Sequence, residues 1–264
     1  MSSTDRAERI SHLRGAVAAL ECASPRSARL KLTRELDHRL SGGLAGDALH
    51  EIAPAEPADA PAAFGFTLAL AARFMAARRA SALLAVEDFA CVQGGAPFGP
   101  GLVAHGLDLS RLVFVRAPDP GSLFQALEDA LKSGALAVVV GEVWRLAKYD
   151  LSISRRLTLA ARAGATPALL TLPTAHGQTL STAAETRFEI AASPSPREPS
   201  AGAGKPLPGA PAFAARLVKT RGQGGDPSRV IRLIWRSEEQ AFDDPAIPVP
   251  VAAAPGDRSG AARA

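Results

Sequence analysis

The sequence predicts an α/β fold, with a mainly parallel sheet flanked by helices and a β-hairpin near the C-terminus. Two observations support this prediction. Between about residues 48 and 172, short runs rich in Val, Leu and Ala alternate with longer segments of helical periodicity, as in βαβ units. Several short runs are apolar at consecutive positions, which is typical of strands covered on both faces. A chain of 264 residues suffices for one large domain or two small ones.

Two helical stretches are expected before the first strand. Residues 1–22 have apolar side chains at helical spacing with arginines on other faces, and residues 26–40 form a second stretch that ends at Ser41-Gly42-Gly43. The first helix either docks on a partner protein or packs on its own domain, and both alternatives stay open. Its candidate interface residues are Ile10, Leu13, Val17 and Leu20.

The core is expected to begin with a strand at residues 48–53 and a helix at residues 62–79. The middle of that helix is apolar on almost every side, so it is predicted to lie against the sheet. Residues 54–61 carry three prolines, which restrict the backbone. Neither a helix nor a central strand is therefore expected between the two elements.

Strands and helices alternate in the middle of the chain. Two helices are expected there, at residues 122–132, where Ser122 and Gln125 form a capping box, and at about residues 152–164. The expected strands are residues 81–86, 113–116, 135–140 and 168–172.

The last part of the chain has a different composition. Six prolines at residues 193–212 indicate a linker or long loop, and residues 213–221 and 229–236 flank a glycine-rich turn as a β-hairpin. The tail has almost nothing to bury and is expected to be disordered. The predicted organisation is a helical segment (1–40), an α/β core (41–192), a linker (193–212), a hairpin that completes the core (213–242) and a tail (243–264).

Composition narrows the functional classes. The net charge of +4 does not by itself indicate nucleic-acid binding, because an excess of Arg and Ala is also typical of a GC-rich genome. Cys22 and Cys91 are too few for a disulfide framework or a Cys-rich zinc site. With no apolar run of membrane-spanning length and no signal peptide, a soluble cytoplasmic protein is expected.

Several strings resemble, in the right order, the RecA-type recombinase fold over about residues 36–236. One of them matches the core strand that ends, in that family, in a catalytic Glu, which is Glu87 here. The matching strings are LSGGLAGDALHEI (40–52), LAVED (84–88), HGLDLSRL (105–112), residues 125–146 and ARLVKTR (215–221).

Within that superfamily, the chain is similar to the ImuA family of RecA-like accessory proteins of damage-induced mutagenesis. The supporting strings are AAFGFTLALAARF (62–74), AVVVGEVWRL (137–146), SRRLTLAA (154–161) and AETRF (184–188). The resemblance implies a role in translesion synthesis. It also implies two partners, an ImuB-like homologue of Y-family polymerases and the alpha subunit of an error-prone polymerase. RecA and DNA are further candidate partners.

A phosphate-binding loop is not expected in this chain. Such a loop needs glycines, a lysine and a Ser or Thr, so that N–H groups, an ammonium group and Mg²⁺ meet the phosphates. At the equivalent place stand Pro54, Glu56, Asp59 and Pro61. Prolines remove backbone donors, and carboxylates repel a triphosphate. The nucleotide site is therefore predicted to be lost.

The other residues of a nucleotide site also depart from the family pattern. Gly141 replaces the strand-end acid that holds magnesium, although Glu142 follows directly and could shift into that role. Glu87 stands at the position of the catalytic Glu but has no phosphate to act on. The five histidines show no metal-binding spacing. We therefore expect no cofactor, no metal and no enzymatic activity.

The predicted hairpin carries several cations and one acid. Two interpretations stay open, phosphate contacts with DNA and a solvated basic face. In active recombinases, the two loops equivalent to the connections after Leu146 and after Pro173 bind DNA. Both connections are short here, which disfavours recombinase-like DNA binding. The candidate binding residues for DNA or a partner are Arg216, Lys219, Arg221, Arg229, Arg232 and Arg236.

Two alternative functions remain open from the sequence. One is a DNA-dependent ATPase with an unorthodox nucleotide site. The other is an inhibitor of cell division like SulA, another degenerate RecA-like protein.

Overall fold

We describe the fold from a computed structural model of the chain. The structure describes residues 28–174, 181–198, 207–221 and 228–243. The predicted N-terminal helix, with Ile10, Leu13, Val17 and Leu20, lies outside the described residues, as does the predicted tail beyond Asp243.

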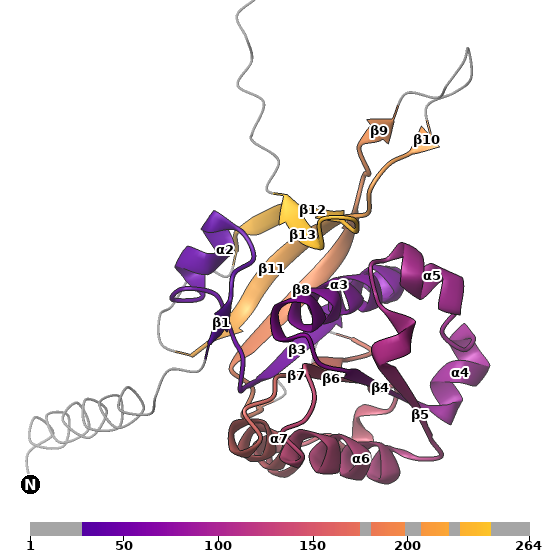
Figure 1. Cartoon of the computed structure of the whole chain (residues 1–264), viewed down its shortest axis with the longest axis vertical. Coiled ribbons are helices and arrows are strands. Elements are labelled where there is room, and N and C mark those ends of the chain that lie inside the picture. Colours follow the sequence, from indigo (N-terminus) through magenta and orange to yellow (C-terminus); the bar gives the residue numbers. More distant parts are fainter. Residues whose placement is uncertain (1–27, 175–180, 199–206, 222–227, 244–264) are drawn as a thin grey trace, which may run out of the picture.

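A nine-stranded sheet forms the centre of the molecule, with the strand order β13-β12-β11-β8-β3-β7-β6-β4-β5 (Figure 1). The six strands from β8 to β5 in that order run parallel, and β11, β12 and β13 are antiparallel to their neighbours. The architecture is consistent with a RecA-like α/β fold and confirms the predicted fold class. The strands are β3 (Leu49–Pro54), β4 (Ala82–Glu87), β5 (Leu112–Ala117), β6 (Val138–Glu142), β7 (Ala168–Thr171), β8 (Thr186–Ser193), β11 (Ala212–Thr220), β12 (Val230–Arg236) and β13 (Ala241–Asp243).

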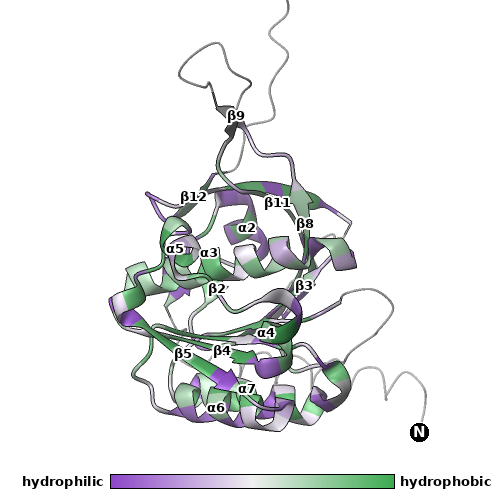
Figure 2. Ribbon diagram, turned by 90° about the vertical axis from the view of Figure 1, so that its right-hand side faces the viewer, coloured by the Kyte–Doolittle hydropathy of each residue, from purple (hydrophilic) through white to green (hydrophobic). Residues whose placement is uncertain are grey.

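Helices cover the sheet on both faces. Helix α3 (Ala60–Arg78) lies on one face, where the sheet curls so that β8, β11 and β12 arch over it, and helices α6 (Pro120–Lys132) and α7 (Leu151–Ala163) lie on the other (Figure 2). Each face buries its own apolar cluster. By length and composition, the segment Pro57–Arg78 could also span a membrane. In this fold its side chains cover the sheet instead, and the ring of Phe66 contacts those of Phe188, Phe213 and Phe242.

Smaller elements surround this core. The short helices α4 and α5, which the sequence did not predict, connect β4 to β5 together with a 3₁₀ turn, and a two-stranded ribbon (β9 and β10) lies within the predicted linker. Their bounds are α4 (Asp88–Gly94), α5 (Gly99–Ala104), η1 (Pro57–Asp59), η2 (Leu109–Arg111), η3 (Leu146–Lys148), β9 (Arg197–Glu198) and β10 (Leu207–Pro208).

The prediction of one helix at residues 26–40 was wrong. Strand β1 (Arg29–Leu30) pairs instead with β2 (Leu44–Ala45), and the helix α2 covers only Arg34–Arg39. Thr33 sets the start of this helix, because its extended backbone and its hydroxyl, which accepts a hydrogen bond from the Leu36 N–H, form an N-cap.

The prediction for residues 54–61 was also wrong in part. Pro54 is the last residue of the central strand β3, where it lies opposite Ile190 of β8. Pro57 begins the turn η1, and Pro61 lies in the first turn of α3, where a missing N–H leaves no intrahelical hydrogen bond unmade. The prolines therefore shape the exit from the strand and the start of the helix.

The caps of two helices and the start of one strand differ from the predictions. Asp119 and Asp150 cap α6 and α7, each through a carboxylate that accepts a backbone N–H three residues on. The predicted cap at Ser122 was therefore wrong, as was the prediction that Ser152 or Ser154 opens the second helix. Strand β6 begins at Val138, not at residue 135, and runs through Gly141 to Glu142. The hairpin of residues 213–221 and 229–236 is confirmed as β11 and β12.

Candidate functional site

The carboxyl ends of the parallel strands β3, β7, β6 and β4 meet at one edge of the sheet. Ligands of open α/β sheets bind at this edge, just beyond the strand ends. Here it carries the loop at residues 55–59, Glu87, Glu142 and the loop after β6, which together are the candidate site. The question is whether these groups face a ligand or one another.

The loop after β3 uses its backbone donors within the protein. The Ala55 N–H donates to the Ile190 carbonyl at 2.8 Å, and the Glu56 N–H donates to Asp59 Oδ2 at 3.3 Å. Asp59 Oδ1 accepts the N–H of Ala192 at 2.8 Å, so the same carboxylate ties the loop to the end of β8. The N–H groups of Ala55 and Glu56 are therefore already bonded within the protein, and the Asp59 carboxylate beside them would repel a phosphate.

Glu87 is fully buried, and both of its carboxylate oxygens are engaged. Oε1 accepts the N–H groups of Trp144 and Arg145 at 2.9 and 3.3 Å, and Oε2 pairs with Arg145 Nε at 3.0 Å. The carboxylate thus fixes the loop after β6 against the end of β4. The two oxygens accept three hydrogen bonds from the loop after β6, and this arrangement is that of a positioning residue for that loop.

A second buried carboxylate holds the far end of the same loop. The Tyr149 hydroxyl donates to Glu51 of the central strand, and Arg187 Nε pairs with Glu51 Oε2 at 2.7 Å. Both Glu51 and Tyr149 are buried. The connection from β6 to α7 is therefore tied to the sheet at its start and at its end.

Gly141 is where the resemblance would place a magnesium-holding acid, and a side chain there would require the ends of two buried leucine side chains to shift. A Cβ added to Gly141 would lie 2.6 Å from the Leu127 Cδ1 atom and 2.8 Å from that of Leu170. Glu142 lies one residue on, and burial, with the nearby Glu87, raises the pKa of its carboxyl group. Within the described residues, no group of three or more His, Cys, Asp and Glu side chains could hold a metal ion.

An aromatic and arginine cluster occupies the edge above Glu87. The Arg145 guanidinium lies 5.7 Å from the centre of the Phe89 ring, and the rings of Phe89 and Trp144 are 6.3 Å apart. Sequence analysis missed this cluster because Phe89 and Trp144 are far apart in the chain. Aromatic rings and a guanidinium group are suited to contact with another molecule, and they are not the groups that usually act as acids, bases or nucleophiles.

Several large apolar side chains are exposed on the elements between β4 and β5 and on β5 itself. Within the described residues, β5 pairs with β4 alone, so its other edge is open. Val92 and Phe98 are 75% and 71% exposed, and large apolar side chains exposed together usually mark a binding surface. These exposed side chains, called the β5-edge surface below, are Phe89, Val92, Phe98, Val103, Leu109, Val113 and Phe114. Val113 and Phe114 are neighbours on the edge strand, so they point to its two opposite faces.

The basic residues of the hairpin make many contacts within the protein. Three form ion pairs, Arg216 with Glu189, Arg229 with Glu35, and Arg236 with Asp243. The Lys219 ammonium donates to the Thr182 carbonyl at 2.6 Å, and the Arg232 guanidinium donates to that of Pro194 at 2.6 Å. The side chain of Arg221 is exposed. Much of the positive charge thus joins neighbouring segments, and phosphate binding by this face stays a prediction.

Comparison with known proteins identifies relatives. No family model matches the chain. Over 123 residues, 45% of the chain, it is 36% identical to Protein ImuA of Caulobacter vibrioides, in two strains of that bacterium. The chain is related to the ImuA family. The match spans 46% of the length of each ImuA protein, so what a whole ImuA protein does is not carried over by the match itself. The relationship to ImuA confirms the resemblance found in the sequence.

Proposed function

We propose that this ImuA relative is a non-catalytic, RecA-like accessory protein that assists translesion DNA synthesis in the cytoplasm by binding other proteins. The relationship to ImuA supports a role in DNA damage and mutagenesis. The non-catalytic part of the proposal rests on the hydrogen bonds at the carboxyl ends of the parallel strands. The donors of Ala55 and Glu56 and both oxygens of Glu87 already have protein partners.

The β5-edge surface supports the protein-binding part of the proposal. Seven of the ten large apolar side chains that are exposed within the described residues belong to α4, to α5 and the residue before it, to η2 and to β5. An accessory protein needs such a surface, whereas an enzyme would need an open pocket at the strand ends. The partners that we propose are an ImuB-like polymerase homologue and the alpha subunit of an error-prone polymerase. RecA and DNA are further candidates.

The cellular test is the frequency of ultraviolet-induced mutations in a strain deleted for the gene. We expect induced mutations to fall on deletion and to return with the wild-type gene, but not with the double variant Val92→Glu/Phe98→Glu. Val230→Glu is a matched control, because Val230 is also exposed but lies on β12, away from the β5-edge surface. An unchanged mutation frequency in the deletion strain would refute the proposed role.

A binding test distinguishes the accessory role from an ATPase. A ligand at a hundred times its Kd stabilises a protein by about 2.7 kcal/mol, which a thermal-shift titration detects easily. We expect no concentration-dependent rise in melting temperature with Mg-ATP. A clear rise would show that the folded chain binds a nucleotide and would favour the ATPase alternative.

A further inference from the structure

Positive charge gathers at the amino ends of the parallel strands, at the edge of the sheet opposite to the candidate site. A helix that connects two parallel strands runs back along the sheet, so its last turn lies beside these amino ends. Arg78 and Arg162 lie in the last turns of α3 and α7. Arg221 directly follows β11, whose last residue, Thr220, lies opposite Thr186 at the start of β8. The topology therefore brings three arginines to one edge.

Hydrogen bonds hold a fourth arginine close to Arg78. The Arg78 guanidinium donates to the Ala165 carbonyl, just after α7, at 2.6 Å and also to the Gly46 carbonyl. Arg29 of β1 donates to the Gly43 carbonyl at 2.9 Å. Gly43 and Gly46 flank the two-residue strand β2, so the two guanidinium groups lie near each other. Because their acceptors are neutral, these hydrogen bonds leave both positive charges uncompensated.

Glu185, just before β8, lies among these arginines. Its carboxyl group interacts with the charges of Arg221, Arg29 and Arg162, and one carboxylate cannot neutralise all three. Lys219 interacts with the charges of Arg221 and Glu185 as well. This cluster, called the amino-end patch below, has five cations and two acids, Arg29, Asp47, Arg78, Arg162, Glu185, Lys219 and Arg221. Its net charge is therefore +3.

Helix ends explain only part of this charge. The dipole of a helix favours cations in its last turn, which accounts for Arg78 and Arg162. Arg29 and Arg221 belong to strand segments and have no such reason to be there. The side chains of Arg162 and Arg221 are exposed, and neither forms a hydrogen bond or an ion pair with any other part of the chain that the structure describes. The patch thus presents charge that the fold itself does not use.

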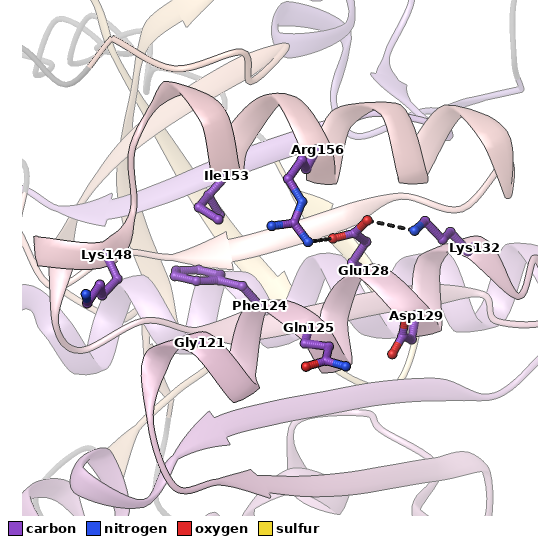
Figure 3. Close-up of a pocket in the computed structure, with 9 residues that line it drawn as sticks. All are labelled: Gly121, Phe124, Gln125, Glu128, Asp129, Lys132, Lys148, Ile153 and Arg156. Atoms are coloured by element: carbon purple, nitrogen blue, oxygen red, sulfur yellow. Dashed lines mark hydrogen bonds and ion pairs between the residues drawn. The ribbon is translucent and has the colours of Figure 1, made fainter.

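The groove between helices α6 and α7 has the opposite character (Figure 3). It has a volume of about 480 Å³ and is lined by three cations, two of which are already paired with an acid. The Glu128 carboxylate lies 2.7 Å from Lys132 Nζ and also pairs with Arg156. These pairs hold the pKa of Glu128 below its usual range. Of the two places, the amino-end patch is therefore the one that attracts an anionic partner.

We propose that the amino-end patch binds the phosphate backbone of double-stranded DNA. The proposal deepens the proposed function, in which DNA is a candidate partner, and rests on it for a role at damaged DNA. The cations are mainly arginines, and the N–H donors of a guanidinium group match two phosphate oxygens at once. Such contacts give affinity without reading the base sequence.

The surroundings of the patch favour a duplex over a single strand. Proteins that bind single strands stack the bases on aromatic rings beside the cations. Among the described residues, the exposed aromatic side chains are Phe89, Phe98 and Phe114, and all three belong to the β5-edge surface. The bases of a single strand would therefore have no ring to stack on at the amino-end patch, whereas a duplex keeps its bases stacked on one another.

The surroundings also disfavour an acidic protein. The centre of a protein interface is rich in apolar and aromatic side chains and poor in charged ones. Among the large apolar side chains that are exposed in the described part of the chain, only Leu159 lies within three residues of a member of the patch, Arg162. One leucine does not form an apolar centre, and phosphate contacts do not need one.

The test measures fluorescence anisotropy of a labelled DNA duplex of mixed sequence with the purified full chain at several salt concentrations. We expect binding whose logarithm of affinity falls linearly with the logarithm of the salt concentration. Arg162→Gln/Arg221→Gln should weaken the binding about tenfold at low salt and reduce the salt slope by about two, because two phosphate contacts are lost. A single strand of the same sequence should bind more weakly than the duplex.

Glu185→Gln should change the affinity in the opposite direction. It removes a negative charge from among the arginines, so it should strengthen the binding of the duplex about threefold, the effect of one unit charge at about 7 Å in water. A variant that had merely lost its fold would not bind more tightly. No strengthening would contradict the assignment of phosphates to this patch.

Arg116→Gln/Lys148→Gln is the matched control, because it removes two exposed cations, on β5 and in η3, that lie away from the patch. It should leave the affinity and the salt slope unchanged, and every variant should keep the wild-type melting temperature within a few degrees. If the duplex does not bind, or if the control weakens binding as much as Arg162→Gln/Arg221→Gln, the proposal is wrong.

Two further outcomes would also overturn the proposal. A single strand that binds more tightly than the duplex would show that the bases take part. Labelled polyglutamate that binds more tightly than the duplex, and loses its binding in Arg162→Gln/Arg221→Gln, would assign the patch to an acidic protein. These measurements use only the purified chain, so their failure is distinguishable from that of the proposed function, which the deletion strain tests.

Discussion

His50 shows at the scale of one residue how a polar side chain is accommodated in the core. It is fully buried on β3, with Nδ1 2.8 Å from Thr186 Oγ1 and Nε2 2.8 Å from the Ala45 carbonyl oxygen. Burial lowers its pKa from 6.5 to about 4. The folded protein therefore keeps this ring neutral at pH values where the unfolded chain protonates it.

We predict that this difference makes the fold acid-sensitive. A depressed pKa means that stability is lost as pH falls from about 6.5 toward 4. The free energy of unfolding should decrease by about 1.4 kcal/mol per pH unit, and by about 3 kcal/mol in total. Urea unfolding followed by Trp fluorescence at pH 7.5, 5.5 and 4.5 would measure it. His50→Gln should reduce the pH dependence over this range, and the remainder would include His105, whose pKa burial also lowers. Parallel curves for the two proteins would contradict the prediction.

Glu87 gives a second prediction for a single side chain. Glu87→Ala removes an acceptor for two N–H groups and leaves the Arg145 guanidinium without its buried partner. The Arg145 side chain is 47% exposed and can be hydrated, so the loss comes mainly from the two N–H groups left without their acceptor, and we expect the free energy of unfolding to fall by about 2 kcal/mol. Asp88→Ala is the control, because the Asp88–Arg116 pair is exposed and should cost less than about 1 kcal/mol. An equal, small loss in both variants would show that Glu87 does not hold the loop.

At the scale of elements, the contact between α6 and α7 depends on Gly164. Its φ of −89° suits any residue, but a Cβ added there would lie 1.8 Å from the Leu131 carbonyl oxygen. Gly164→Ala should therefore force the C-terminal ends of the two helices apart and lower the free energy of unfolding by about 2 kcal/mol. Gly94→Ala, with no atom within 4 Å of the added Cβ, should be neutral or slightly stabilising. Equal melting temperatures for the two variants would contradict this account.

The elements that the sequence predicted well are those decided by local composition. The strands β3, β4, β5 and β7 lie within one or two residues of their predicted limits, because continuous apolar runs bounded by turn residues have few other structures open to them. Strand β8 was missed. Phe188 and Ile190 face the core, whereas Arg187 and Glu189 between them are only partly buried, and the prediction did not use this alternation. The helix α2 is only six residues long, and its start is set by the single cap at Thr33. The spacing of apolar residues over a longer window does not detect such a cap, so one longer helix was predicted.

For the whole molecule, the sequence predicted the strands of the sheet better than the surfaces that residues from different elements form together. Prolines and acids at residues 54–61 indicated the loss of a phosphate loop because those residue types act through local chemistry. The contact of Phe89 with Trp144 and the groove between α6 and α7 join residues from different elements, so only the folded chain brings them together. The same holds for the β5-edge surface, whose residues come from α4, α5, η2 and β5.

The open edge at β5 leads to a prediction about the isolated protein. An unpaired strand beside exposed apolar side chains invites association with another chain when the natural partner is absent. We expect the average sedimentation coefficient of the purified chain to rise with concentration in the micromolar range. Val92→Glu/Phe98→Glu should reduce this rise, because charges on the two most exposed apolar side chains of α4 and α5 oppose burial. Val230→Glu should sediment like the wild type. If the wild-type chain stays monomeric at every concentration, the prediction of self-association through the β5 edge is wrong.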